Sequence, residues 1–528
     1  MSKIYCYLKE KRHQMIFAAV FFLGICVHGS RIFPAYYFHD DAVMFGVGTT
    51  YTSGRWFLQV LYKLQMLIMG SSINAKGFMG MAVLALFAVI CCMIADGLGM
   101  KRKRSLLLLA GIVMTFPYMP SILSYTYTAP HYCISIIMSL AAALLMQSGD
   151  NLWQKLLRSA AGIVLLGLSM AVYQTNLCIF VAFLAVLAIK NSLDQEGTEP
   201  WKSYIARCLR YLSGCILGCL CYYVSNVAVL HLKGFAMSGY QGLDHMEDIT
   251  PGQFFQRSAL AYKEFFLPDP DRNYSFYHEP PVRWCYWCIL LALVVCAVLF
   301  LLKELRNRNF GKAVQLLILF CILPLAIHSV FLTADAATTN IYSLMMFGGV
   351  MVFVCLIGAL EKLENVYGRN GRHLTQWGII VPVILLLHMC IYFAYIANVC
   401  YTKTAIQQEQ AIGYFNRLII RIQMTEGYSP DKPVAYVYEL NKNTERQYIR
   451  FIDSDGYGIA AYNYDSVINM YNWKEYMEMW CGFRPWEISG EALWEYMDNP
   501  EVEAMPTYPN AGSIKEIDGV IVVKFDPY

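Results

Sequence analysis

The chain carries about eleven apolar segments of near membrane-spanning length, and this feature restricts its fold more than any other. A helix needs about 20 apolar residues to cross about 30 Å of hydrocarbon. Of the 528 residues, 57% are hydrophobic and only 15% are charged, whereas an average soluble domain has about 25% charged residues. The sequence therefore predicts a polytopic α-helical membrane protein, with spans at about 15–30, 77–97, 105–120, 130–147, 157–172, 174–190, 211–231, 284–302, 313–332, 341–360 and 377–397.

Two stretches need separate arguments. A single helix over 157–190 would be about 50 Å long, which is too long for one ordinary crossing. Basic residues at both of its ends favour a hairpin that turns at YQTN (173–176). The stretch 56–69, WFLQVLYKLQMLIM, is amphipathic, and we expect it either along the interface or as a short further insertion.

Lysine and arginine set the expected orientation, because cytoplasmic loops carry an excess of both. With these spans, all basic clusters fall on one side of the membrane, and the opposite loops 121–130, 173–176 and 333–340 contain no Lys or Arg. We therefore expect a multi-pass protein of the cell membrane with a cytoplasmic N-terminus. The basic clusters lie at 3–12, 101–104, 155–158, 190–210, 303–312 and 362–372.

The charge pattern and composition predict two domains. Residues 1–400 form the transmembrane domain, and residues 401–528 form a small extracytoplasmic α/β or α+β domain. Within the second domain we expect a helix at 404–424 and a strand at 434–440. The stretch IKEIDGVIVVKF (514–525) predicts two strands joined by a tight turn at Asp518-Gly519.

Four outer connections bring polar and aromatic residues to the same membrane face. Plainer explanations compete for each group. The acids suit a solvated loop or a helix cap, and the Arg-Trp pair suits an interfacial anchor. The tyrosines suit an aromatic belt, the amides a buried turn, and the histidines a structural role. The candidate residues are His39, Asp40, Asp41, Arg55, Trp56, Tyr125, Tyr127, His131, Tyr173, Gln174, Asn176, His328, Asp335 and Asn340.

Geometry constrains any site that uses both the acids and the arginine. In one straight helix over 41–55, Asp41 and Arg55 would lie about 21 Å apart. A shared site therefore requires a broken or re-entrant segment, which Gly46, Gly48 and Gly54 permit. No phosphate-cradling glycine loop, HExxH or paired CxxC pattern occurs. We expect no nucleic-acid partner and no required cofactor, with a divalent metal left open.

Three short motifs carry a family likeness. They are the acidic first outer loop followed by SGRW (53–56), the YQTN stretch that heads an apolar span, and the tail ending MPTYPNAGSIKEIDGVIVVKF. Together they resemble the type II Gtr glucosyltransferases, membrane enzymes that decorate surface polysaccharides such as O-antigen. The similarity extends over nearly the whole chain. One departure is that the family commonly has an arginine near the start of the tenth span, where this chain has ATTNIYSLMMFG (337–348).

The resemblance implies a GT-C-like fold and a glycosyltransferase, specifically a hexosyltransferase. The expected reaction moves a sugar, glucose, from a polyprenyl-phosphate donor to a surface polysaccharide on the outer face. Asp40 or Asp41 would take the proton of the acceptor hydroxyl, and Arg55 would contact the departing phosphate. Substrate binding would involve His39, Arg55, Trp56, Tyr127, His131, Tyr173, Gln174, His328 and Asp335.

The implied partners are the lipid-linked sugar, the polysaccharide acceptor and membrane lipid, together with a flippase and a donor synthase. The alternative is a polytopic transporter or flippase for a lipid-linked glycan precursor. Transporters tend to show internal repeats, broken midplane helices and intramembrane charges. This sequence shows none of these clearly.

Overall fold

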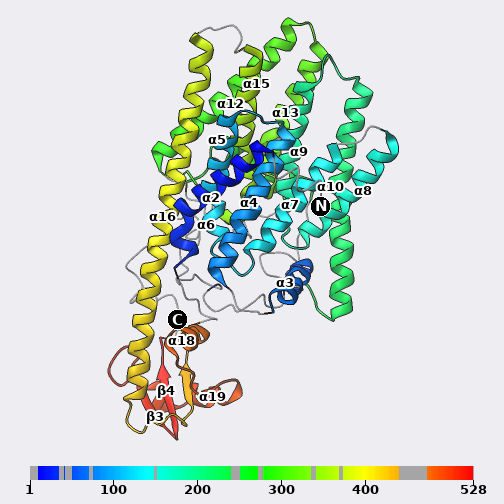
Figure 1. Ribbon diagram of the computed structural model, residues 1–528. Coiled ribbons are helices and arrows are strands. Elements are labelled where there is room, and N and C mark those ends of the chain that lie inside the picture. Colours follow the sequence, from blue (N-terminus) through cyan, green and yellow to red (C-terminus); the bar gives the residue numbers. More distant parts are fainter. Residues whose placement is uncertain are drawn as a thin grey trace. The chain divides into compact units, whose positions relative to one another are not determined.

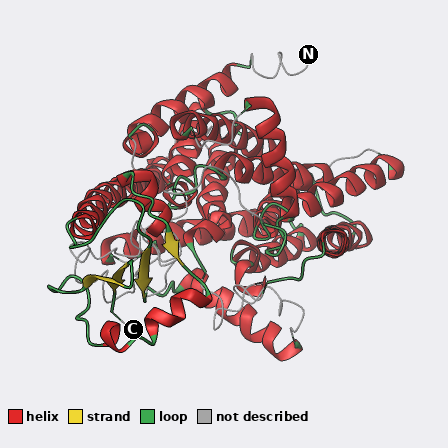
Figure 2. Cartoon of the chain, turned by 90° about the horizontal axis from the view of Figure 1, so that it is seen from below, coloured by secondary structure: helices red, strands yellow, loops and turns green. Residues whose placement is uncertain are grey.

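The computed structural model describes residues 10–34, 41, 50–70, 75–147, 151–238, 250–270, 276–277, 279–333, 341–367, 373–438 and 473–526. Most of this chain is helical (Figures 1 and 2), with the strands confined to one small group. It divides into two compact units. The first comprises Met1–Phe33, Gly46–Asn398 and Gly456–Ala461, and the second comprises Pro34–Phe45, Val399–Asp455 and Tyr462–Tyr528.

The first unit is built from helices. Eight helices in the described chain are long and apolar enough to cross a membrane: α2 (Lys11–Ile32), α4 (Lys76–Leu98), α7 (Ala129–Gln147), α9 (Asn176–Asp194), α10 (Trp201–Lys233), α12 (Pro280–Arg306), α13 (Phe310–Ile327) and most of α16 (His373–Gln423). The fold class expected from the sequence is confirmed. The remaining helical elements are shorter or more polar: α3 (Trp56–Met69), α5 (Lys103–Thr115), α6 (Tyr118–Ile122), α8 (Leu152–Met170), α11 (Pro251–Phe266), α14 (Val330–Thr333), η3 (Ser343–Met345), η4 (Phe347–Val350) and α15 (Met351–Tyr367).

Three expected spans correspond to helices outside the group of eight. The span at 105–120 is interrupted, because Pro117 moves Phe116 out of helical geometry (ψ 139°) and ends α5 after 13 residues. The span at 341–360 begins as two 3-10 turns, and its α-helix starts only at Met351. The span at 157–172 lies within α8, whose first turns carry Lys155 and Arg158. Length and composition therefore support eight spans, and the expected count of eleven is not confirmed.

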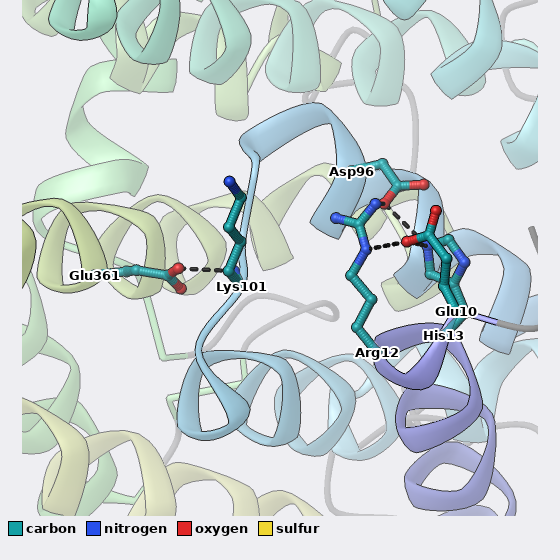
Figure 3. Close-up of polar contacts among 6 residues, drawn as sticks. All are labelled: Glu10, Arg12, His13, Asp96, Lys101 and Glu361. Atoms are coloured by element: carbon teal, nitrogen blue, oxygen red, sulfur yellow. Dashed lines mark hydrogen bonds and ion pairs between the residues drawn. The ribbon is translucent and has the colours of Figure 1, made fainter.

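Helix ends in the first unit are joined by ion pairs. Figure 3 shows Arg12 and His13 of α2 beside Asp96 of α4. The Arg12 Nη2 and the His13 Nε2 each lie 3.0 Å from the Asp96 Oδ1. His13 is fully buried there. These contacts fix α2 against α4 at the same end of α4 that leads into the basic cluster at 101–104.

The predicted hairpin within 157–190 is present. Helix α8 ends at Met170 and α9 begins at Asn176. The buried Asn176 amide donates to Ser135 Oγ (2.7 Å) and to Ser169 O (3.1 Å). Ser139 Oγ lies 2.9 Å from Ser169 Oγ, and Ser169 Oγ donates to Ser135 O. This polar network joins α7, α8 and α9.

The second unit contains a four-stranded sheet of order β2-β1-β4-β3. Strand β1 pairs in parallel with β2 and β4, and β3 and β4 form an antiparallel hairpin. The expected turn is confirmed, because Asp518 (φ 50°) and Gly519 (φ 83°) both have the positive φ of a type I′ turn. The elements are β1 (Val434–Val437), α18 (Trp473–Cys481), β2 (Glu487–Ile488), α19 (Glu491–Met497), α20 (Pro500–Glu503), β3 (Ile514–Ile517) and β4 (Val520–Lys524).

The helix expected at 404–424 is not a separate element. Helix α16 runs without a break for 51 residues, from the last expected span into the second unit. Its C-terminal part supplies the buried Tyr414 and Phe415 to an aromatic core. The ring of Phe415 stacks on Trp473 with their centroids 6.1 Å apart, and Trp473 meets Phe525 edge to face.

Candidate active site

The SGRW residues form a closed turn followed by a helix. The Gly54 N–H donates to Tyr51 O (2.9 Å), and the Arg55 N–H donates to Thr50 O (3.1 Å). The Thr50 hydroxyl in turn donates to Arg55 O (3.0 Å), and helix α3 starts at Trp56. A straight helix through this stretch is therefore excluded. The turn places Arg55 and Trp56, both half-buried, at the N-terminus of α3.

This loop packs directly on the YQTN turn. The Gln174 side-chain amide donates to Ser53 O (2.7 Å) and to the Tyr222 hydroxyl (3.1 Å), and the same hydroxyl donates to Gly54 O (3.2 Å). At Gly54 (φ +71°), a Cβ atom would lie within 3.0 Å of both Tyr222 Oη and Gln174 Nε2. Only glycine combines this backbone angle with so close an approach.

The arginine of the loop lies over an aromatic ring of the same turn. The Arg55 guanidinium carbon is 4.9 Å from the centroid of Tyr173, which is buried and packs against Tyr132. A backbone hydrogen bond from Phe57 N to Ala171 O (3.0 Å) joins the start of α3 to the end of α8. Four predicted site residues, Arg55, Trp56, Tyr173 and Gln174, are thus gathered at one place.

Two further predicted residues lie at the start of α7. His131 is buried in its first turn, next to the Tyr132 that packs on Tyr173. Tyr127 is half-buried in the turn that leads into α7. Both belong to the same end of the bundle as the YQTN turn.

His328 occupies a different setting. It follows the last residue of α13, where its ring meets Phe265 edge to face at 5.5 Å and lies 5.9 Å from Phe331. It also lines a small cavity of about 10 Å³ together with Glu264, room for about one water molecule. In the part of the chain that the structure describes, His328 contacts this aromatic group and not the SGRW loop.

The sequence analysis did not identify two residues that the structure places beside candidate residues, Tyr222 at the SGRW loop and Glu264 beside His328. Tyr222 sits in an apolar span, where nothing distinguishes it from a packing residue. Glu264 is a buried carboxylate on α11, and it accepts a hydrogen bond from the Asp269 N–H (3.1 Å). For Glu264 alone the sequence held a signal, which was the abundance of tyrosine and acidic residues in the stretch 233–283.

The acidic residues are described only in part. Asp41 is 2% exposed and clusters with the second unit, although the sequence assigned it to the transmembrane domain. The predicted His39, Asp40 and Asp335 lie outside the described residues. Among the described side chains, no group of three or more His, Cys, Asp or Glu could hold a metal ion.

The fold and this loop define a polytopic helical membrane protein with a guanidinium and several aromatic residues gathered at one end of its bundle. Residues 30–353 match the sequence profile of a family described as Glucosyl transferase GtrII. Because the match covers more than half of the chain, the protein belongs to the GtrII glucosyltransferase family. The expected family is confirmed, although the matched range does not include the C-terminal motif.

Two solved structures of archaeal oligosaccharyltransferase from Archaeoglobus fulgidus are similar to the chain. One is AglB in complex with an inhibitory peptide and a dolichol-phosphate, with 11% identity, a TM-score of 0.34, and coverage of 86% of this chain and 60% of that one. The other is a complex with Zn and sulfate, with 10% identity, a TM-score of 0.32, and coverage of 80% and 56%. This chain thus spans about 60% or less of their length. No curated protein matches the sequence.

Proposed function

We propose that the protein transfers glucose from a polyprenyl-phosphate donor to a polysaccharide at the outer face of the cell membrane. One observation carries the proposal. The two family motifs, SGRW and YQTN, form a single structural unit in which Arg55 is held over Tyr173 at the end of the helix bundle. A fixed cation beside aromatic rings suits a ligand that has both a phosphate and a sugar face.

The distribution of basic residues supports the outer location. The SGRW loop packs at the start of α9, whereas Lys190 and Asp194 stand at the other end of that helix. There Arg102 pairs with Glu364 at 2.7 Å, and Lys312 donates to Gln195 O at 2.6 Å. Basic segments from several connections thus share one end of the bundle, as a cytoplasmic face requires.

In the proposed reaction, the bond between the anomeric carbon and the phosphate oxygen breaks as a bond to the acceptor oxygen forms. The acceptor proton passes to a carboxylate, which we assign to Asp41 or Asp40. The leaving group is the polyprenyl phosphate, and its charge is stabilised by the Arg55 guanidinium. Two adjacent acids repel each other, which favours the protonated form of one of them and makes that acid a stronger base.

A lipid-linked donor fits the sequence better than a nucleotide sugar. The sequence contains no phosphate-cradling glycine loop, and the candidate residues lie at the face where nucleotide sugars are not supplied. A lipid donor would enter sideways from the bilayer and reach a loop that leads directly into an apolar helix. Helix α3 exposes Leu64, Leu67 and Ile68, which suits contact with lipid.

The test uses the purified full-length protein in lipid nanodiscs with a surface-polysaccharide acceptor. Polyprenyl-phosphoglucose, the corresponding galactose lipid and a nucleotide glucose are offered separately, and transfer is followed by mass spectrometry of the acceptor. We expect product only with the glucose lipid. Transfer from the nucleotide sugar without a lipid intermediate would overturn the donor assignment, and preference for galactose would overturn the sugar.

A further inference from the structure

A cavity of about 300 Å³ lies within the first unit, at the end of the helices opposite the SGRW loop. Its volume is at the lower bound of ordinary ligand sites. Most of its lining residues come from α9, α12 and α15, and the rest are Leu98, Gly99, Met100, Lys101 and Phe320. On α12, for example, Leu293, Cys296 and Phe300 lie at intervals of three and four residues, which places them on one side of the helix.

The lining changes from apolar to charged along the helix axes. On α9 it runs from Val186 to Asp194, and on α15 from Val354 to Asn365, a distance of about 16 Å along the axis of α15. The deeper positions are aliphatic or aromatic, and the charged positions stand at the helix ends. The polar lining residues are Lys101, Lys190, Asp194, Glu361, Lys362 and Asn365.

The charged residues at the helix ends form what we call the mouth of the cavity, and on one side of it lysines outnumber acids. Asp194 is shared by two lysines, with Lys190 at 3.3 Å and Lys362 in direct contact. The side chain of Lys101 is exposed and forms no ion pair with any described residue. Such a group of lysines suits a phosphate, and basic pockets between helices are typical sites for lipid headgroups.

Glu361 also stands at the mouth, and its carboxylate requires a hydrogen-bond donor from the ligand, whereas the lysines suit an anion. Its Oε1 atom accepts hydrogen bonds from the backbone N–H groups of Lys101 (2.8 Å) and Arg102 (3.2 Å), as Figure 3 shows for Lys101. Its Oε2 atom is buried and has no hydrogen-bond partner among the residues that the structure describes, on a side chain that is only 6% exposed and lines the cavity. A buried acceptor of this kind requires a donor.

We infer that the cavity binds a phospholipid whose headgroup carries both a phosphate and a primary ammonium, which is the chemistry of phosphatidylethanolamine. The phosphate lies among the lysines, the ammonium donates to Glu361 Oε2, and an acyl chain follows the apolar wall. The headgroup end of the site, at Asp194, is about 27 Å along α9 from Asn176 of the YQTN turn, and the nearest lining residue of that helix, Val186, is about 15 Å away. The cavity is therefore separate from the site proposed for the sugar donor.

The test is lipid competition on the full-length protein, read by native mass spectrometry. Phosphatidylethanolamine, phosphatidylcholine and phosphatidylglycerol with identical acyl chains are offered in equal amounts. We expect about tenfold preference for phosphatidylethanolamine over phosphatidylcholine, because a trimethylammonium group cannot donate a hydrogen bond to the carboxylate. Equal retention of these two lipids would overturn the inference, as would stronger retention of phosphatidylglycerol, which lacks an ammonium.

Two variants locate the site. In Glu361→Gln the amide oxygen still accepts from the Lys101 and Arg102 N–H groups, but no acceptor faces the ammonium, so the preference should fall to within about twofold. At Gly358 a Cβ would meet atoms no closer than 3.9 Å, so Gly358→Leu fills the cavity and should remove the retained lipid. The control is Gly378→Leu, where nothing lies within 4 Å on an exposed helix face. Unchanged retention in Gly358→Leu would overturn the inference.

Discussion

The Arg55 guanidinium carbon lies 4.9 Å above the centre of the Tyr173 ring. This contact joins the connection between α2 and α3 to the α8–α9 hairpin. A cation–π contact contributes about 0.5–1 kcal/mol at an exposed site and about 2 kcal/mol when desolvated, and Tyr173 is buried. It uses the face of the guanidinium, whereas hydrogen bonds to a phosphate use the edge.

Arg55→Ala should raise the KM for the lipid donor at least tenfold and leave the KM for the acceptor nearly unchanged. Arg55→Lys should restore donor binding only in part, because an ammonium lacks the bidentate geometry. Steady-state kinetics with each substrate varied in turn checks this. Lys63→Ala, which removes an exposed cation from the same helix, serves as the control. Normal donor kinetics with a reduced amount of membrane-inserted protein would instead support an interfacial anchor.

The acid pair gives a second prediction. Asp41→Asn or Asp40→Asn should lower the transfer rate at least 100-fold, because one of these two acids is the general base of the proposed reaction. The amount and melting temperature of the membrane protein should stay near those of the parent. Transfer assays on both single variants and the double variant measure the effect, with the exposed Asp498→Asn as control. Full activity in the double variant would exclude both acids.

The third prediction concerns Gly54, where the energetic cost of the positive φ can be separated from the cost of steric overlap with neighbouring side chains. Gly54→Ala should destabilise the protein by about 2–4 kcal/mol, from the positive φ and from overlap with Tyr222 and Gln174. Gly70 has a similar φ of +67° with nothing within 4 Å, so Gly70→Ala should show only the backbone cost of about 1 kcal/mol. Thermal unfolding of both variants compares them. Equal losses would mean that the loop does not pack as described.

The orientation of the chain can be tested by chemical labelling. A cysteine replacing the exposed Lys515 of the second unit should react with an impermeant thiol reagent in intact cells. A cysteine replacing the exposed Lys103, in the basic cluster before α5, should react only after permeabilisation. The parent protein must first prove unreactive, because Cys26, Cys288 and Cys321 are exposed. The reverse pattern would place the acids on the cytoplasmic side.

How much the sequence predicts depends on how local each feature is. The fold class, the hairpin at 173–176 and the turn at Asp518-Gly519 rest on local composition and backbone preference, and all three are present. The interruption of the third expected span follows from Pro117, a local signal that hydropathy averaging conceals. Such features need no knowledge of tertiary packing.

Most of the candidate site depends on distant contacts. Gln174 and Tyr222 contact the SGRW loop only because three separate segments pack together. The sequence alone does not predict which residues of these segments lie opposite one another. His328 likewise has the same local signal as His131, yet it packs against Phe265 of α11. The clustering of Asp41 with the second unit also depends on contacts that periodicity does not encode.

Asn176 should prove structural rather than catalytic. Asn176→Ala removes two buried hydrogen bonds and leaves Ser135 and Ser169 without them, at a cost of about 1–3 kcal/mol. Thermal unfolding in detergent should show this loss, whereas Asn307→Ala, at an exposed helix end, should be neutral. The KM for the lipid donor should not change in the folded fraction. A selective donor defect would place Asn176 in the site.

The serine and asparagine network that joins α7, α8 and α9 also bears on the order in which the chain assembles. Two apolar helices gain little from the hydrophobic effect once both are in lipid, so hydrogen bonds and close packing must select their register. Ser135 and Ser139 of α7 precede α8 and α9 in the sequence, so we expect α7 to enter the bilayer before the hairpin. The hairpin can therefore complete its hydrogen bonds as it arrives. We therefore expect insertion and docking of the hairpin to be coupled, and the turn that supports Arg55 to form before the later spans are added.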